Sequence, residues 1–183
     1  YPLRRLRQMC IRDRPTLTPP ADPSNGVIFD MVEYVCSAID LYQEITGHKK
    51  LKKVSTPFCP EGSLVHADDC ERGELGGKAC KILMKNLWAA RLARPDFQKP
   101  ICDLATKVQT WSRNDDKRLY RLICYMFSSQ EYVLCGKVED KPEDLKLLLF
   151  VDADFSGESG HTRSTSGGLL VLAGPSTWFP IML

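Results

Sequence analysis

The stretch LLLFVDADFSG, residues 147–157, runs five apolar residues into two aspartates and a glycine turn. An apolar run of this length followed by a turn signal predicts a buried β-strand. Asp152 and Asp154 are two positions apart at the end of that strand, so both can face the same side. Carboxylate pairs suit Mg²⁺ or Mn²⁺, which prefer hard oxygen ligands. The stretch therefore predicts a strand that presents a metal site, although Asp-x-Asp after a strand also occurs in purely structural settings.

The rest of the chain predicts helices first and strands last. Apolar residues recur at helical spacing in four segments, residues 30–46, 77–92, 100–111 and 115–128. In the first helix, Asp30 and Glu33 form a predicted cap pair and Gly47 is the stop; the fourth is predicted to begin after Asn114 or Asp115. Strand patterns bounded by Gly, Pro and charged turns cover residues 132–136, 145–152, 167–174 and 177–183. The predicted fold class is α+β.

Composition leaves several function classes open. The chain has 183 residues, 43% hydrophobic, and a net charge of +2, which neither demands nor excludes nucleic acid. No apolar run approaches the roughly 20 residues of a membrane helix, and no signal peptide is expected. Eight cysteines occur without any Cys-x-x-Cys. We interpret them as reduced, structural residues of an intracellular protein that is not secreted.

The first 26 residues are not expected to belong to the fold. MCIRD, residues 9–13, back-translates to ATG TGT ATA AGA GAC, the end of a transposase adapter used in sequencing libraries. Residues 1–14 are therefore predicted to be a non-native leftover of library preparation, the alternative being a genuine basic, disordered arm. Residues 15–26 carry four prolines and predict a linker.

Two groups of cations are candidates for contacting a phosphate backbone, although a solvated surface is the alternative in both cases. The first group, in a predicted loop, is Lys49, Lys50, Lys52 and Lys53. The second group, on or next to the fourth predicted helix, is Arg113, Lys117, Arg118 and Arg121. Asp68 and Asp69 sit in a polar, Gly-rich stretch and are interpreted as a loop pair. Trp88 and Trp111 are interpreted as core residues in preference to base-stacking residues.

Two enzyme classes also use an Asp-x-Asp after a strand. The pattern resembles the first motif of haloacid-dehalogenase-type phosphatases, which need a Lys and further acids on later strands. Only 29 residues follow Asp154, with no lysine and no acid beyond Glu158, which argues against that class. For metal-dependent glycosyltransferases, no sugar-nucleotide domain is recognised ahead of the motif.

Three motifs in order carry a family resemblance: FVDADFSG (150–157), HTRSTSGG (161–168) and GPSTW (174–178). They closely resemble the start of the ribonuclease H domain in Ty1/copia-type retrotransposon polyproteins, which reads in outline Y-x-D-A-D-W-A-G, R-S-T-S-G-Y and I-S-W. This chain departs from that outline at Phe155, at Gly168 and at Pro180 after Trp178.

The resemblance extends upstream and covers about residues 27–183. In that family the reverse transcriptase ends with K-x-V-x-T-P-F, a helix closing on T-R-P-D-I, and two further helices. This chain has Lys52, Val54, Thr56, Pro57 and Phe58, then ARPDF at 93–97. The resemblance implies that residues 27–136 are the C-terminal, thumb- or connection-like part of reverse transcriptase. Residues 137–144 would then be a hinge and residues 145–183 the first strands of a truncated ribonuclease H-like domain.

The resemblance also implies a function for the intact protein. Asp152 matches the first catalytic carboxylate of ribonuclease H, with Mg²⁺ or Mn²⁺ as cofactor and Asp154 as a second candidate ligand. The substrate would be an RNA–DNA hybrid or primer–template duplex, in a cytoplasmic virus-like particle or the nucleus, without a membrane partner. The polymerase motif Y-x-D-D does not occur in the sequence, and the later carboxylates would come after Leu183. The chain is therefore expected to be an inactive fragment that lacks the other polyprotein parts; the alternative is a non-catalytic helical nucleic-acid-binding module or a domesticated remnant.

Overall fold

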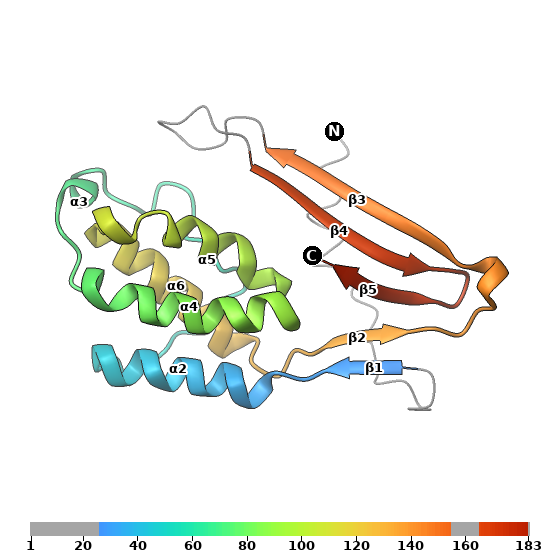
Figure 1. The fold of residues 1–183 in the computed structure, drawn as a ribbon. Helices are drawn as coiled ribbons and strands as arrows, with labels where there is room; N and C mark the ends of the chain where they lie inside the picture. The colour runs from blue at the N-terminus through green and yellow to red at the C-terminus, as the bar shows by residue number, and fades with distance from the viewer. Residues whose placement is uncertain (1–25, 155–164, 183) are drawn as a thin grey trace. The chain divides into compact units, whose positions relative to one another are not determined.

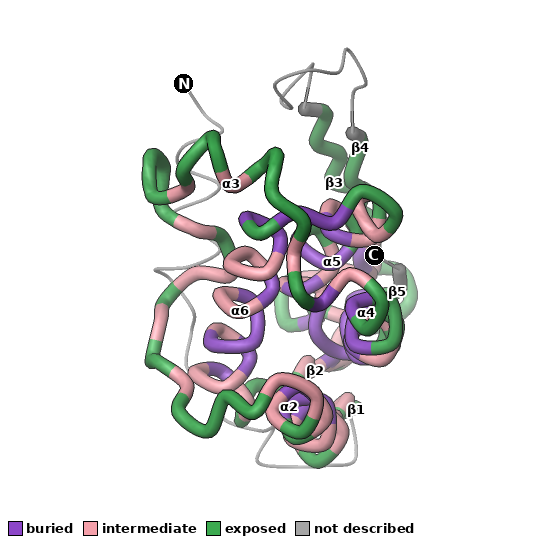
Figure 2. Tube along the Cα trace, turned by 90° about the vertical axis from the view of Figure 1, so that its left-hand side faces the viewer, coloured by how far each residue is buried: buried purple, intermediate pink, exposed green. Residues whose placement is uncertain are grey.

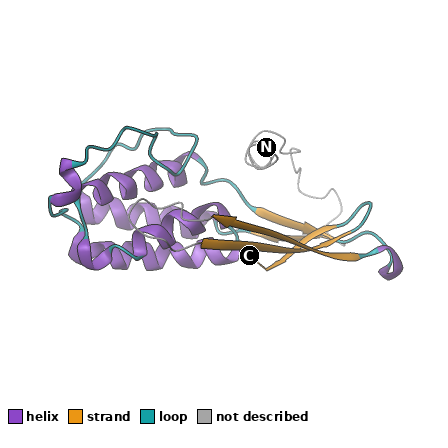
Figure 3. Cartoon of the chain, turned by 90° about the horizontal axis from the view of Figure 1, so that it is seen from above, coloured by secondary structure: helices purple, strands orange, loops and turns teal. Residues whose placement is uncertain are grey.

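The computed structural model describes residues 26–154 and 165–182, so the predictions for residues 1–14 and for residues 15–25 of the linker lie outside it. The described residues form five α-helices and a five-stranded sheet (Figure 1), which is the α+β class predicted from the sequence. Helices and strands occupy separate stretches of the chain apart from the first strand (Figure 3). They make two compact units, a helical unit over 29–134 and a sheet unit formed by the other described residues.

The helical unit packs its long helices around one apolar core. Its helices are α2 (Val32–Thr46), α3 (Ala67–Cys70), α4 (Gly76–Leu92), α5 (Gln98–Ala105) and α6 (Arg113–Ser128), with the 3-10 turns η2 (Pro95–Phe97) and η3 (Val108–Thr110). Along α6, Leu119, Leu122, Ile123 and Met126 are fully buried at helical spacing. Figure 2 shows that buried positions run along the inner side of each long helix. The predicted amphipathic faces are therefore the ones that make the core.

The predicted stop of α2 at Gly47 is correct, but its predicted start at Asp30 is two residues early, because α2 begins at Val32 with Met31 at the N-cap position. The predicted ends of two other helices are also wrong. The N–H of Val32 donates to the Asp30 carboxylate over 2.8 Å, and Gly47, with φ of 72°, ends α2 in the left-handed conformation. The third predicted helix stops at Ala105, because residues 108–110 tighten into η3. The fourth begins at Arg113, before the predicted start.

Ser112 explains the early start of α6. Its hydroxyl oxygen accepts from the N–H of Asp115, and the Asp115 carboxylate accepts from the N–H of Ser112 over 3.0 Å. This reciprocal arrangement is a capping box with aspartate in place of the usual glutamate. The cap satisfies two backbone donors in a buried place, since Ser112 and Asp115 are only 6% and 2% exposed.

The sheet unit is built from β1 (Gly26–Phe29), β2 (Leu134–Lys137), β3 (Lys146–Asp154), β4 (Thr165–Ala173) and β5 (Trp178–Met182). The strand order is β1-β2-β5-β4-β3, and the pairs β2–β5, β4–β5 and β3–β4 are antiparallel. Between β2 and β3 a single 3-10 turn, η4 (Pro142–Asp144), occupies the predicted hinge. The sequence did not predict β1, and β2 joins the sheet unit although its pattern was grouped with the helical part.

The apolar run of β3, a pattern typical of a buried strand in a complete sheet, is exposed in the described residues, as expected of sheet strands without covering helices. Leu147, Leu149 and Val151 are 65%, 62% and 75% exposed, and Phe150 is 45% exposed. The exposed residues belong to both faces of the strand, so the described residues leave both faces of β3 largely uncovered, and as the last strand in the order β3 also pairs on one side only. Burial is instead found one strand further in, where Val171 of β4 is fully enclosed.

The two tryptophans assigned to the core differ in burial. Trp111 is 4% exposed and belongs to the core, as predicted. Trp88 on α4 is 56% exposed, so its assignment to the core is wrong. The inner face of α4 is already filled by other residues, among them Ala89 and Ala90 at 0% exposure.

We predict that Ser112→Ala lowers the free energy of unfolding by about 1 kcal/mol, because the N-terminus of α6 loses its cap. Urea unfolding followed by far-UV circular dichroism measures this. Ser55→Ala, a serine in an exposed loop, is the control and should stay within about 0.5 kcal/mol of the wild type. Equal stability of the two variants would show that the capping box contributes nothing.

Candidate functional site

The β3–β4 hairpin positions the two candidate metal-binding aspartates. The apolar run of β3 pairs in continuous register with β4, so that Asp152 lies opposite Gly167 and Asp154 opposite Thr165. The DAD motif and the TSG part of the second motif are therefore paired partners in one hairpin. Asp152 is exposed to solvent at the far end of β3.

The described residues supply only part of a metal site. No group of three or more His, Cys, Asp or Glu side chains comes together within residues 26–154 and 165–182. The segment 155–164, which includes the motif residues Gly157, Arg163 and Ser164, lies outside them. Asp152 fits Mg²⁺ or Mn²⁺ as one oxygen ligand, and Asp154 follows two positions later in the strand. Water or phosphate oxygens would have to complete such a shell.

The four loop lysines extend from a backbone that is held on both sides. The Gln43 amide donates to the carbonyls of His48 and Lys49, over 3.0 and 3.2 Å. The Tyr120 hydroxyl donates to the carbonyl of Lys50 over 3.5 Å, and the N–H of Val54 donates to the Ser128 hydroxyl over 2.8 Å. The exposed residues of this anchored loop include all four lysines: Lys49, Lys50, Lys52 and Lys53.

The imidazole of His48 adds a further anchor to the loop. It hydrogen-bonds the Tyr42 hydroxyl over 3.1 Å and meets the Tyr120 ring edge-on at 5.4 Å between ring centroids. Burial raises the pKa of Tyr42, so this phenol stays protonated. The lysine loop is thus a defined surface of the helical unit.

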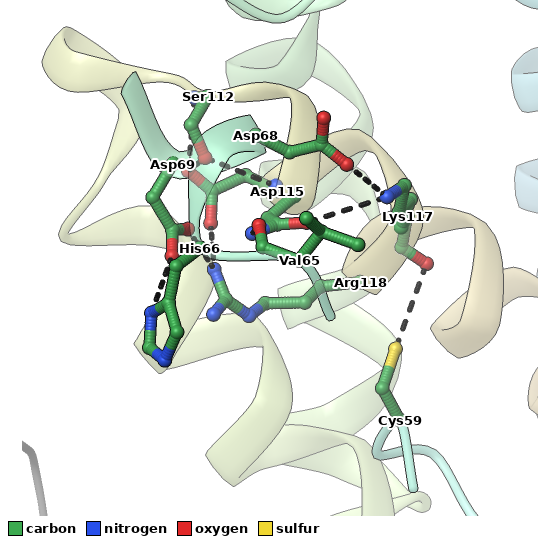
Figure 4. A network of polar contacts seen from close by, with 10 residues as sticks. Cys59, Val65, His66, Asp68, Asp69, Ser112, Asp115, Lys117 and Arg118 are labelled. Atoms are coloured by element: carbon green, nitrogen blue, oxygen red, sulfur yellow. Dashed lines mark hydrogen bonds and ion pairs between the residues drawn. The ribbon is translucent and has the colours of Figure 1, made fainter. Parts of the chain in front are cut away.

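The second predicted group of cations has partners within the helical unit (Figure 4). Lys117 is hydrogen-bonded to Asp68, and Arg118 lies 2.7 Å from Asp115 and 3.9 Å from Asp69. Arg113, outside the figure, pairs with Glu71 over 2.8 Å. Those contacts neutralise three cations of α6 locally.

Arg121 is engaged by backbone and hydroxyl oxygens. Its guanidinium donates to the carbonyl and to the hydroxyl of Thr56, both over 2.9 Å. Thr56 belongs to the segment that carried the upstream resemblance, so this contact ties that segment to α6. With Arg121, all four predicted binding cations of α6 donate to groups of the same unit.

The acids that pair with α6 were not recognised from the sequence. Asp68 and Asp69 lie on the short helix α3, not in a loop as predicted. A hydrogen bond from Lys117 holds the pKa of Asp68 below its usual range, and the hydrogen bond that Arg113 donates to Glu71 raises the pKa of Arg113. In the sequence, a cluster of acids precedes a cluster of bases by some 40 to 50 residues. That spacing alone does not predict which acid pairs with which base.

The turn before α4 is fixed by Asp116 of α6. Its carboxylate accepts from the backbone N–H groups of Glu74 and Leu75, over 2.7 and 3.2 Å, and from the Trp111 indole over 2.7 Å. Gly73 passes so close that a side chain there would collide with the carbonyl of Ser112. The turn and the start of α6 therefore form one polar structure.

The ARPDF motif contains an ion pair between a buried arginine and a half-buried aspartate. The Arg94 side chain is 3% exposed and makes two hydrogen bonds to the Asp96 carboxylate, over 3.0 and 2.7 Å. It also donates to the carbonyl and hydroxyl of Ser129, over 2.8 and 2.7 Å. The guanidinium lies 4.0 Å from the centroid of the Phe97 ring. Sequence reasoning used this motif only for its resemblance and missed that it joins the end of α4 to the end of α6.

No family model, curated protein or solved structure matches this chain. Within the part of the chain that the structure describes, no helix is long and apolar enough to cross a membrane.

Arg94→Ala is expected to lower the free energy of unfolding by about 3 kcal/mol, because the half-buried Asp96 carboxylate and the buried Ser129 groups lose their partner. Arg94→Lys should recover only part of that loss, since an ammonium cannot make the paired contacts of a guanidinium. Arg91→Ala, three residues earlier and exposed, is the matched control. Chemical denaturation measures the free energy of unfolding of the three variants. If Arg94→Ala is as stable as Arg91→Ala, the ion pair of Arg94 does not stabilise the helical unit.

Lys117→Met is expected to raise the pKa of Asp68 toward the ordinary value of an aspartate, because the hydrogen bond that lowers it is gone. A depressed folded-state pKa stabilises the protein above the unfolded pKa, and this contribution is lost as pH falls through the depressed value. Carboxyl-carbon NMR titration of Asp68 gives the pKa in each protein. Lys50→Gln, a change of charge in the lysine loop, should leave it where it is in the wild type.

Proposed function

We propose that this chain is the C-terminal part of a reverse transcriptase joined to the start of a ribonuclease H-like domain, from a Ty1/copia-type Pol polyprotein. The observation that carries the proposal is the β3–β4 hairpin. In it Asp152 stands at the end of the first strand of an antiparallel run β3-β4-β5, directly opposite Gly167 of the second motif. Residues of the first and second motifs, which are separated in sequence, are thus neighbours in space, as parts of one site are expected to be.

The helical unit supports the same proposal in a coarser way. The helices α2, α4, α5 and α6 follow one another in the order that the resemblance implies. The segment with Thr56 and the segment with Arg94 both contact α6, over the hydrogen bonds given above. The two upstream motifs therefore have structural reasons for their residue types.

In the intact polyprotein, we propose, this region helps to hold a primer–template duplex during RNA-directed DNA synthesis. Asp152 there contributes one carboxylate to the cleavage of RNA in an RNA–DNA hybrid, with Mg²⁺ or Mn²⁺ supplying the charge that stabilises the reacting phosphate. One exposed carboxylate cannot position two ions, so we expect no cleavage by this chain alone.

A second candidate function is binding of nucleic acid without chemistry. The observation that favours it is the anchored loop with four exposed lysines, since clustered cations release counterions from a phosphate backbone. This role fits a polyprotein fragment and a domesticated remnant equally.

Binding and cleavage of a labelled RNA–DNA hybrid test these functions together. We expect salt-dependent binding, and replacement of Lys49, Lys50, Lys52 and Lys53 by Gln should reduce the slope of log affinity against log salt by up to about 4. The control variant replaces the four cations of α6 by Gln: Arg113, Lys117, Arg118 and Arg121. Because these side chains donate to groups of the helical unit, their loss should lower stability more than it changes the salt dependence of binding. No hybrid affinity at low salt would remove the nucleic-acid role.

Cleavage is measured in the same samples with and without Mg²⁺. We expect none, and hence no effect of Asp152→Asn on the substrate. Mg²⁺-dependent cleavage that Asp152→Asn abolishes would contradict the expected inactivity. The family assignment itself is tested by reading the genomic frame around this sequence: a Y-x-D-D segment upstream and a Glu-bearing helix downstream are expected, and their absence at an intact locus contradicts it.

A further inference from the structure

Helix α4 carries several positive charges and no negative ones. Its sequence, GGKACKILMKNLWAARL, contains three lysines and one arginine and not a single acid. The neighbouring helix α2 is the opposite, with Glu33, Asp40 and Glu44 and no lysine or arginine. A chain with a net charge of only +2 therefore separates its charges between adjacent helices.

The outer face of α4 also carries large apolar side chains. Met84, Trp88 and Leu92 are 45%, 56% and 42% exposed, and their spacing of four residues places them in one row. This exposure does not reflect poor packing of the helix. On the opposite side Ile82 and Leu83 are fully buried, so the inner face of α4 is complete without them.

The free cations of α4 lie in the same region as this row. Lys81 lies three residues before Met84, and Arg91 lies three residues after Trp88. At this helical spacing the two cations share the exposed face with the apolar row. Both side chains are exposed, and neither makes an ion pair with a residue that the structure describes. The cations of α6 differ, since acids of the same unit or Thr56 already engage them.

We propose that this face of α4 binds single-stranded nucleic acid, with Trp88 stacking on a base and Lys81 and Arg91 contacting phosphates on either side. Cations without acids select a polyanion, and an exposed indole between them offers a stacking surface of the kind that single-strand-binding proteins use. A duplex fits less well, because its base faces are covered by its own stacking.

The proposal rests on the exposure and charge of α4 and does not require the polyprotein assignment. It also uses residues other than the lysine loop, so the two binding surfaces can be separated by mutation. RNA and DNA present the same phosphates and base faces, and both are therefore tested.

The experiment measures anisotropy of labelled single-stranded DNA and RNA oligonucleotides, and of a duplex of equal length, against the full chain. We expect tighter binding of the single strands. Trp88→Ala should weaken single-strand binding by about tenfold, and Trp88→Phe, which keeps a ring, should restore most of it. Lys81→Gln with Arg91→Gln should lower the salt slope by about 2, while Lys107→Gln, outside α4, leaves affinity and slope unchanged.

Several outcomes overturn the proposal. One is equal affinity of Trp88→Ala and wild type for single strands, with both proteins folded by circular dichroism. A second is a preference for the duplex that the lysine-loop variant removes and Trp88→Ala does not, which leaves the hybrid-binding function intact. A third is self-association without single-strand affinity, detected by sedimentation and abolished by Trp88→Ala, because the row would then be a contact between copies.

Discussion

The packing of the helical unit depends on the partners of one buried charge, the guanidinium of Arg94. A guanidinium removed from water loses a large hydration energy, which only well-placed acceptors and a favourable ring face can offset. Arg94 finds Asp96 beside it in sequence and Ser129 at the end of α6, and Asp96 in turn accepts from the Tyr125 hydroxyl over 2.9 Å. The chain reversal after α4 is therefore not a simple turn. It is fixed in register against α6, because any shift would leave buried donors without acceptors.

A second polar structure secures the opposite end of the same helices. Asp116 caps the turn before α4 and holds the Trp111 indole, while Asp115 completes the cap of α6. With Arg94 at one end and Asp116 at the other, α4 is tied to α6 by polar contacts at both ends and by apolar burial between them. Such double anchoring explains how a helix without a single acid, and with an exposed tryptophan, is held in place by one face alone.

The sequence predicted most of the fold, because hydrophobic periodicity is a local signal. The core positions of α6, the stop at Gly47 and the end of α4 before Pro95 all follow from residues close in the chain. The errors arise where distant residues decide. Trp88 has the same type and helical context as a core residue, and only the arrangement of the other helices leaves it exposed. Ser112 was overlooked because its partner at the third helical position is Asp and not Glu.

The candidate site was less predictable, because its charges are defined by pairing. From sequence the bases of α6 and those of α4 look equally available to a ligand. Pairing with Asp68, Asp69 and Glu71 engages the bases of α6, whereas α4 has no acid within it to do the same.

The acids of β3 pose the reverse problem. Their sequence context is specific, yet the described residues bring no third donor to them. A strand with apolar side chains exposed on both faces and carboxylates at its end is stable in water only as part of a larger arrangement. The apolar run and the two acids therefore point to the same requirement. A surface that covered Leu148 and Phe150, which lie on the same face of β3 as Asp152, would also decide whether that carboxylate has neighbours with which to hold an ion.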